Sequence, residues 1–249
     1  MPADPQCPRC HGAGFIYTER DGYETAARCD CYLAQLSAQF ESASRIPPRY
    51  QQASFENFKL PENNPVARQG LATVLLQARA YARDYPNTDR PGLLFVGDPG
   101  TGKTHLAVAT LRILISRGFE GLFFDYQRLL EQIRSSYDPA SGQTDRDVYR
   151  TALDSPLLLL DDLGAQRITD WTEDTVTSII TYRCNHELPL IATTNLPDAD
   201  FGSHMYEGSR MKRSLSEAIG ARAQSRIFEM CKVIKMPAVE DYRKRSARA

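Results

Sequence analysis

The sequence predicts a three-layer α/β fold, in which a parallel β-sheet lies between two layers of helices and a small cysteine-rich unit precedes it. Two apolar runs indicate buried strands, Leu93-Leu94-Phe95-Val96 and Leu157-Leu158-Leu159-Leu160. Continuous apolar strands are typical of parallel sheets that are covered on both faces. After the first run, Ala107, Leu111 and Leu114 have helical spacing. This alternation of strand and helix predicts the layered arrangement.

Four of the six cysteines lie within the first 31 residues: Cys7, Cys10, Cys29 and Cys31. Two close pairs at this separation can form a tetrahedral thiolate site for Zn²⁺. The segment between the pairs predicts a hairpin with an Asp21-Gly22 turn, which suits a zinc ribbon. We therefore expect a structural Zn²⁺ held by the four cysteines. His11 is an alternative ligand, because Cys-x-Cys is tighter than the usual spacing.

A helix is predicted over residues 32–45, where Leu33, Leu36 and Phe40 have helical spacing. We expect this stripe to pack against the zinc-binding head, and docking onto a partner protein is the alternative. Pro47-Pro48 ends the helix and indicates a linker. We therefore predict a head with a helical linker over residues 1–46 and a larger domain over residues 47–249.

The loop Gly97-Asp98-Pro99-Gly100-Thr101-Gly102-Lys103-Thr104 follows the first apolar strand and opens a helix. This is a complete P-loop, in which glycines let backbone N–H groups surround phosphates at a helix N-terminus. Lys103 is expected to reach the β- and γ-phosphates, and the Thr104 hydroxyl to ligate Mg²⁺. The chain is therefore predicted to bind ATP with Mg²⁺.

Two later strands are predicted to end in polar residues. A strand at residues 122–126 and a helix at residues 127–137 come first, and the Leu157-Leu158-Leu159-Leu160 run then ends in Asp161-Asp162. Asp161 is placed to hold Mg²⁺, and Asp162 to orient the attacking water. The next strand ends at Asn195, which can bond the γ-phosphate or that water. This pattern predicts an ATPase.

A helical stretch at residues 216–230 carries Arg222 and Arg226, four residues apart on one face, before a last strand at 232–235. Two arginines at this place fit an arginine finger that enters the active site of a neighbouring subunit. Such a finger acts between subunits, so we expect self-association through the ATPase domain.

Composition limits the remaining possibilities. The 249 residues carry a net charge of −1, so total charge does not indicate nucleic-acid binding. No apolar run approaches the ~20 residues that span a bilayer, and no signal-peptide core is present. We therefore expect a cytoplasmic protein without membrane contact.

Together these motifs resemble the DnaC/IstB-like AAA+ ATPases, which comprise bacterial and phage replicative-helicase loaders and related transposition helpers. The resemblance runs from about residue 50 to residue 243. It includes Ser54-Phe55-Glu56-Asn57-Phe58, Thr193-Thr194-Asn195, Ser225-Arg226-Ile227-Phe228 and Asp241-Tyr242-Arg243. It implies a sheet of order 5-1-4-3-2, Asn195 as sensor 1, and Arg226 as arginine finger with Arg222 beside it.

The resemblance also implies a function: ATP-dependent loading of a replicative hexameric DNA helicase onto single-stranded DNA, with the zinc-binding head gripping the helicase. The alternatives are a transposition helper ATPase that binds DNA and recruits a transposase, and an ATP-binding adaptor without significant turnover. Asp162 stands where many AAA+ proteins have Glu, so slow hydrolysis is expected. Only 23 residues follow Arg226, too few for the three-helix lid that carries sensor 2.

Overall fold

The computed structural model describes residues 3–20, 23–135, 146–197, 206–207, 210–211 and 213–242. In chain order the described elements are β1 (Phe15–Arg20), β2 (Tyr23–Arg28), α1 (Asp30–Ala43), the 3₁₀ turn η1 (Pro48–Tyr50), α2 (Pro65–Asp84), β3 (Gly92–Val96), α3 (Lys103–Ser116), β4 (Gly121–Asp125), α4 (Tyr126–Ser135), α5 (Arg146–Asp154), β5 (Leu157–Asp161), α6 (Asp170–Asn185), β6 (Leu190–Thr194), β7 (Tyr206–Glu207), β8 (Arg210–Met211), α7 (Leu215–Ile219), α8 (Ala221–Met230) and β9 (Cys231–Lys235).

The central sheet has five parallel strands in the order β4-β5-β6-β3-β9. Numbered from the P-loop strand β3, this is the order 5-1-4-3-2 that the sequence analysis predicted. β3 lies between β6 and β9, with Leu93 opposite Ile191 and Lys232. The carboxyl ends of β3, β5 and β6 therefore meet at one edge of the sheet, where a ligand site is expected.

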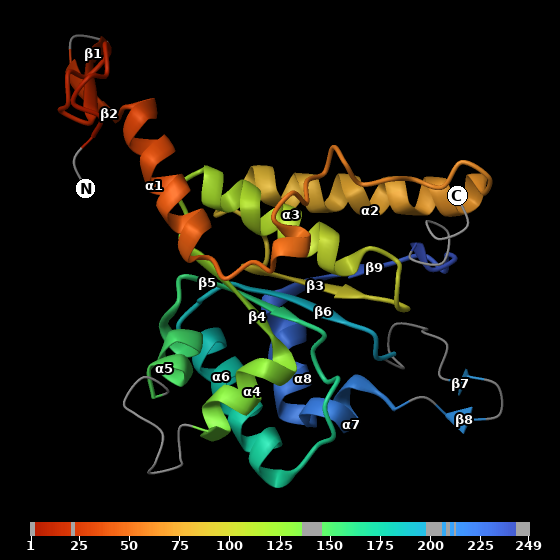
Figure 1. Cartoon of the computed structure of the whole chain (residues 1–249). Helices are drawn as coiled ribbons and strands as arrows, with labels where there is room; N and C mark the ends of the chain where they lie inside the picture. Colours follow the sequence, from red (N-terminus) through yellow and green to blue (C-terminus); the bar gives the residue numbers. More distant parts are fainter. Residues whose placement is uncertain are drawn as a thin grey trace.

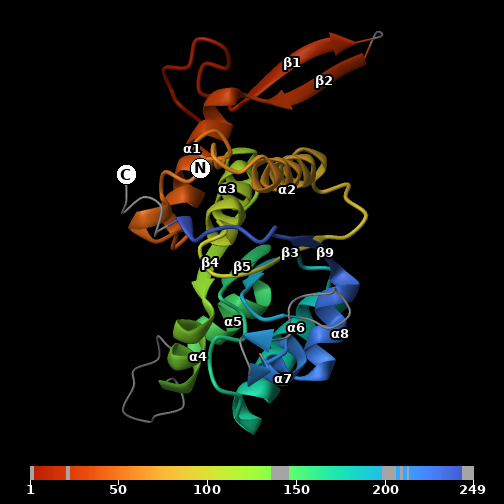
Figure 2. The same cartoon turned by 90° about the vertical axis from the view of Figure 1, so that its right-hand side faces the viewer.

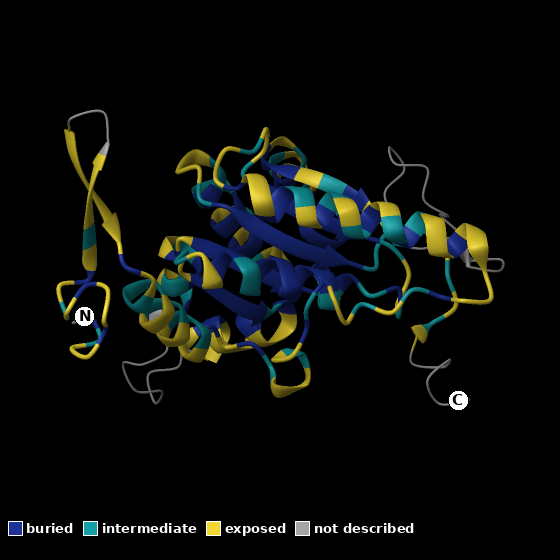
Figure 3. Ribbon diagram, turned by 90° about the horizontal axis from the view of Figure 1, so that it is seen from above, coloured by how far each residue is buried: buried dark blue, intermediate teal, exposed yellow. Residues whose placement is uncertain are grey.

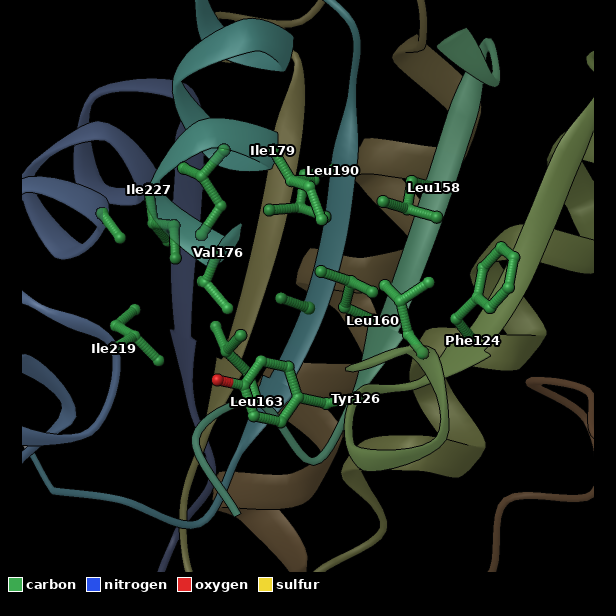
Figure 4. Close-up of a cluster of buried hydrophobic side chains, with 14 of the residues drawn as sticks. Phe124, Tyr126, Leu158, Leu160, Leu163, Val176, Ile179, Leu190, Ile219 and Ile227 are labelled. Carbon is green, nitrogen blue, oxygen red and sulfur yellow. The ribbon is translucent and has the colours of Figure 1, made fainter. Parts of the chain in front are cut away.

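Helices cover both faces of the sheet, and each face has its own core (Figure 1). α2 and α3 cover one face, where Leu93 and Phe95 of β3 join the buried cluster. The alternate residues Leu94 and Val96 belong to the cluster on the other face, beneath α4 to α8. Figure 4 shows this second cluster, with Leu158 and Leu160 of β5 pointing toward the helices. Burial on both faces explains why β3 and the first four residues of β5 are apolar.

The head is a two-stranded antiparallel hairpin, β1-β2, beside a compact cysteine-containing loop. It extends away from the sheet at the end of α1 (Figure 2). β2 is exposed along its whole length, as Figure 3 shows. The Asp21-Gly22 turn predicted for the hairpin lies outside the described residues. Such a small unit buries little apolar surface, so it depends on another source of stability.

α1 packs differently from the prediction. Leu33 and Leu36 lie against Gly118 at the end of α3, and Phe40 packs on the core cluster that α3 shares. The stripe therefore covers the larger domain rather than the cysteine-containing head. The physical reason is area, because α3 and its neighbours offer a large apolar surface and the head offers little.

The chain after α1 is also joined to the larger domain. The backbone N–H of Phe123 donates to the Ser44 carbonyl at 2.8 Å, and the Ile46 side chain is buried. The Arg45 guanidinium lies over the Phe124 ring, 4.8 Å from its centroid. The boundary between residues 46 and 47 stays a prediction, and the segment around it is packed against β4.

The helix expected over residues 216–230 is two helices, α7 and α8, separated at Gly220. Gly220 has φ of 86° and ψ of 146°, which a helix does not accommodate. A Cβ built there would lie 2.5 Å from the Glu173 carboxylate, so this tight bend requires glycine.

Within the part of the chain that the structure describes, no helix is long and apolar enough to cross a membrane.

Candidate nucleotide-binding site

The P-loop connects β3 to α3 and is folded around Lys103. The Lys103 ammonium donates to the Asp98 carbonyl at 2.8 Å, and the Thr101 hydroxyl donates to the same oxygen at 2.9 Å. Lys103 is only 5% exposed although it is charged. The loop therefore holds the ammonium at the N-terminus of α3, where the helix dipole and backbone N–H groups favour an anion.

Thr104 and Asp161 meet beside this loop, as predicted. The Thr104 hydroxyl donates to Asp161 Oδ1 at 2.8 Å, and the Thr193 hydroxyl donates to the same oxygen at 2.7 Å. Burial raises the pKa of Asp161 to about 6, against the lowering effect of these two hydrogen bonds. Hydroxyl and carboxylate oxygens are the ligands that Mg²⁺ prefers, and a divalent cation would offset the buried charge. Thr104 and Asp161 therefore fit a bound Mg²⁺.

Asp162 directly follows Asp161, Asn195 lies two residues after Thr193, and the two side chains contact each other. The Asn195 amide donates to Asp162 Oδ1 at 2.9 Å. Asp162 has φ of 55°, in the left-handed region, and its N–H donates to the Thr193 hydroxyl at 3.0 Å. The Asp161 and Asp162 carboxylates thus have different partners, hydroxyl groups for Asp161 and the Asn195 amide for Asp162. The Asp162–Asn195 pair is held where a carboxylate and an amide can both contact a water molecule.

Thr193 is a site residue that the sequence analysis did not identify. It is fully buried, and its hydroxyl contacts both Asp161 and the backbone of Asp162. A signal was present, because two threonines end the otherwise apolar β6 strand. A buried hydroxyl in a strand needs a polar partner, and here the partner is the neighbouring acidic pair.

Of the candidate site residues, P-loop residues 99–104 with Asp161, Asp162 and Asn195 line one cavity of about 470 Å³, a volume typical of small-ligand sites. The rest of its wall comes from segments far away in the sequence. Residues not assigned to the site from the sequence are Arg49, Tyr50, Asn57, Phe58, Lys59, Leu71, His105, Val239 and Tyr242. His105 contacts the Ser54 carbonyl at 2.8 Å and the Phe58 ring, with centroids 5.6 Å apart. The P-loop helix is thereby attached to the Ser54–Phe58 motif of the family resemblance.

Arg222 and Arg226 are not brought to this cavity in their own chain. They lie on α8 and line a groove that α6 completes with Asp174, Thr177 and Ser178. Arg226 forms an ion pair with Glu229 at 2.7 Å, and its side chain is 42% exposed. The predicted finger role therefore depends on a neighbouring subunit and stays a prediction.

The four head cysteines form a cluster that fits a zinc ion. Their sulfur atoms all lie within 4.8 Å of one another, with Cys7 and Cys29 at 3.7 Å and Cys10 and Cys31 at 3.4 Å. Four thiolates at ~2.3 Å from a tetrahedral Zn²⁺ would be ~3.8 Å apart. Backbone N–H groups of Cys10 and Arg9 lower the pKa of the Cys7 thiol to about 7. His11, the alternative ligand, is not part of the cluster.

Comparison with known proteins agrees with this geometry. The sequence model of the family described as "IstB-like ATP binding protein" matches residues 51–249. The phage-like element PBSX protein XkdC of Bacillus subtilis is 25% identical over 90% of this chain and 79% of its own length. The replicative helicase loader DnaC of Escherichia coli K12 is 27% identical over 61% of this chain, and the match spans 59% of DnaC.

Solved structures show the same relationship. A crystal structure of the DnaC helicase loader is 32% identical with a TM-score of 0.61, covering 77% of this chain and all of that one. A structure of DnaI, at 21% identity, has a TM-score of 0.57 over 82% of this chain and 99% of that one. The likeness to DnaI, at this identity, concerns the fold alone.

Proposed function

The chain belongs to the family of IstB-like ATP-binding proteins, and we propose that it is an AAA+ ATPase that loads a replicative DNA helicase onto single-stranded DNA. The observation that carries the proposal is the combination of the Thr104–Asp161 pair beside the P-loop with 32% identity to a DnaC helicase loader.

The site residues supply the chemistry of ATP hydrolysis in this proposal. Lys103 and the loop N–H groups would hold the β- and γ-phosphates, and Thr104 and Asp161 would hold Mg²⁺, which would neutralise charge on the phosphates. Asp162 accepts a proton from the attacking water or orients it, and Asn195 holds the water or the γ-phosphate in line. Arg226 of one subunit, with Arg222 beside it, enters the site of the next subunit.

The head is the helicase-binding module in this account. Its hairpin exposes aromatic side chains, with Tyr17 at 64% and Tyr23 at 77% exposure. Exposed aromatics are frequent anchors of protein interfaces.

The helix α1, which follows the head, is joined to the P-loop helix. Arg112 of α3 contacts Glu41 of α1 at 2.7 Å and the Ala53 carbonyl at 2.8 Å. Because α3 also begins with Lys103, nucleotide binding and partner binding act on the same helix. We infer that this helix couples the two events.

The competing function is that of a transposition helper which binds DNA and recruits a transposase, because the family that the chain resembles also includes such ATPases. The cysteine-containing head supports the helicase-loader hypothesis, because it adds a separate docking unit to the ATPase core.

The two functions differ in their partner. Purified full-length chain should form a complex with the hexameric replicative helicase of its own genome, detected by size-exclusion chromatography with light scattering. Tyr17→Ala with Tyr23→Ala should weaken that complex at least tenfold, whereas Leu76→Ala, an exposed residue of α2, should not change it. If the chain ignores the helicase and coats duplex DNA beside a transposase, the helper function replaces the loader function.

A further inference from the structure

The segment after β9, residues 236–242, crosses the nucleotide-binding edge of the sheet, and we call it the C-terminal strap. The Met236 N–H donates to the Val96 carbonyl at 2.8 Å, immediately before the P-loop. At the other end of the strap, the Tyr242 N–H donates to the Gly100 carbonyl at 3.0 Å, within the P-loop. The strap is therefore attached to the loop that is expected to hold phosphates.

Glycines stand wherever the strap passes closest to the rest of the domain. A Cβ built on Gly97 would lie 2.6 Å from the Met236 Cβ, and one built on Gly100 would overlap the Asp241 carboxylate. Gly97 and Gly100 also have positive φ, so their backbone conformation alone favours glycine.

Gly70 is the informative case, because it lies inside helix α2 and has no such conformational reason. Glycine is among the least favourable residues within a helix, and alanine the most favourable. A Cβ at Gly70 would lie 3.0 Å from the Cβ of Pro237, closer than most side chains allow. The absence of a side chain at Gly70 thus lets Pro237 of the strap pack directly against α2. This close packing indicates that the strap has a defined position on the helix.

The strap lines the same cavity as the phosphate-binding residues. Val239 and Tyr242 of the strap line this cavity together with Lys103 of the P-loop. The aromatic residues Tyr50 and Phe58 line it as well. The Tyr242 side chain is 41% exposed, so aromatic surface is available for a ligand to cover. A nucleotide has an anionic part and a flat aromatic part. The P-loop matches the first, and this aromatic and aliphatic wall matches the second.

We propose that the C-terminal strap is the lid of the nucleotide site, with Tyr242 and Val239 covering the base of the bound nucleotide. The inference rests on the proposed ATP binding and adds a second binding element to it. In this proposal the strap contacts the base through Val239 and Tyr242, and it contacts the phosphate-binding loop through Gly100. The strap therefore contributes more to the binding of a complete nucleotide than to the binding of triphosphate alone.

The test measures binding by the full chain of three probes: ATP, GTP and inorganic triphosphate, each with Mg²⁺, by calorimetry. Tyr242→Ala should weaken ATP binding about tenfold and leave triphosphate binding within twofold, because only the ring contact is lost. Tyr242→Phe should restore the ATP affinity, since it keeps the ring. GTP binding should weaken by a similar factor, because contact with an aromatic ring does not distinguish the two bases.

A second variant moves the strap without touching the cavity wall. Gly70→Leu should displace Pro237 and weaken ATP binding about as much as Tyr242→Ala, whereas Thr73→Leu, an exposed position on the same helix, should bind as the wild type does.

Two outcomes overturn the inference: Tyr242→Ala binds ATP as tightly as the wild type, or it loses ATP and triphosphate equally. Lys103→Ala separates this failure from failure of the proposed function. If Lys103→Ala loses ATP binding while Tyr242→Ala binds ATP as the wild type does, the lid is rejected and the nucleotide site is retained. If Lys103→Ala binds ATP as the wild type does, the nucleotide site itself is rejected.

Discussion

Replacing Asp161 by asparagine should stabilise the nucleotide-free protein while it abolishes ATP hydrolysis. Burial raises the pKa of this carboxyl from its usual 3.8 to about 6, so the folded protein binds its proton more tightly than the unfolded chain does. The contribution of the Asp161 carboxyl to the free energy of unfolding is therefore highest below pH 4, and it falls as the pH rises from about 4 to 6. Above pH 6 the cost of the buried charge is fully present.

The magnitude follows from the pKa difference of about 2 units. At ~1.4 kcal/mol per unit, the charged carboxylate costs about 3 kcal/mol of folding free energy at pH 8 and about 1 kcal/mol at pH 4.5. Asparagine keeps the Oδ1 acceptor that Thr104 and Thr193 use, so Asp161→Asn should recover most of this cost. We expect the variant to be about 2–3 kcal/mol more stable at pH 8.

The assay is urea unfolding in magnesium-free buffer at pH 4.5 and pH 8. The fluorescence of Trp171 follows it, because this is the single tryptophan and it packs on the core cluster. Asp89→Asn, which removes an exposed carboxylate, is the matched control and should change stability by less than about 0.5 kcal/mol. The reasoning fails if Asp161→Asn is no more stable than the wild type at pH 8, or if its advantage is the same at both pH values.

Three further predictions concern zinc, turnover and assembly. Elemental analysis should find about one Zn²⁺ per chain, and Cys7→Ser should remove it together with the fold of the head. Lys103→Ala should lose ATP binding, whereas Asp162→Asn should keep binding and lose turnover at least ~100-fold in a steady-state ATPase assay. Arg226→Ala should bind ATP yet turn it over about 10³-fold more slowly, and mixing it with Asp162→Asn should restore part of the rate, because each variant supplies what the other lacks.

Each of these three predictions would be contradicted by a specific experimental result. A folded head without metal would remove the zinc site from the account. Equal turnover in wild type and Asp162→Asn would mean that another group acts on the water. Mixed variants that stay as inactive as each alone would place Arg226 outside the neighbouring site.

The sequence indicated the candidate site residues that stand at the carboxyl ends of predicted strands. The P-loop, Asp161 and Asn195 were found because each directly follows an apolar strand, and parallel strands bring their carboxyl ends together. Sheet order followed from the same class of fold. The Thr104–Asp161 contact therefore needed only the motifs and the topology.

Other features depended on packing between distant segments, which local patterns do not encode. The stripe on α1 has the same spacing whether it covers the head or α3, and the larger apolar surface of α3 decided the outcome. The break at Gly220 depends on Glu173 of a different helix. Tyr242 lies 139 positions after Lys103 in the sequence, and only the path of the strap over Gly70 brings it to the cavity.

The most direct test of the proposed function is helicase loading on closed circular single-stranded DNA. A hexameric ring cannot thread onto a circle that has no end, so loading requires a factor that opens or assembles the ring. With ATP, the wild-type chain should increase helicase unwinding of an oligonucleotide annealed to the circle by at least tenfold, and Lys103→Ala should not. Unwinding that is equally fast without the chain, or equally fast with Lys103→Ala, would contradict its assignment as an ATP-dependent helicase loader.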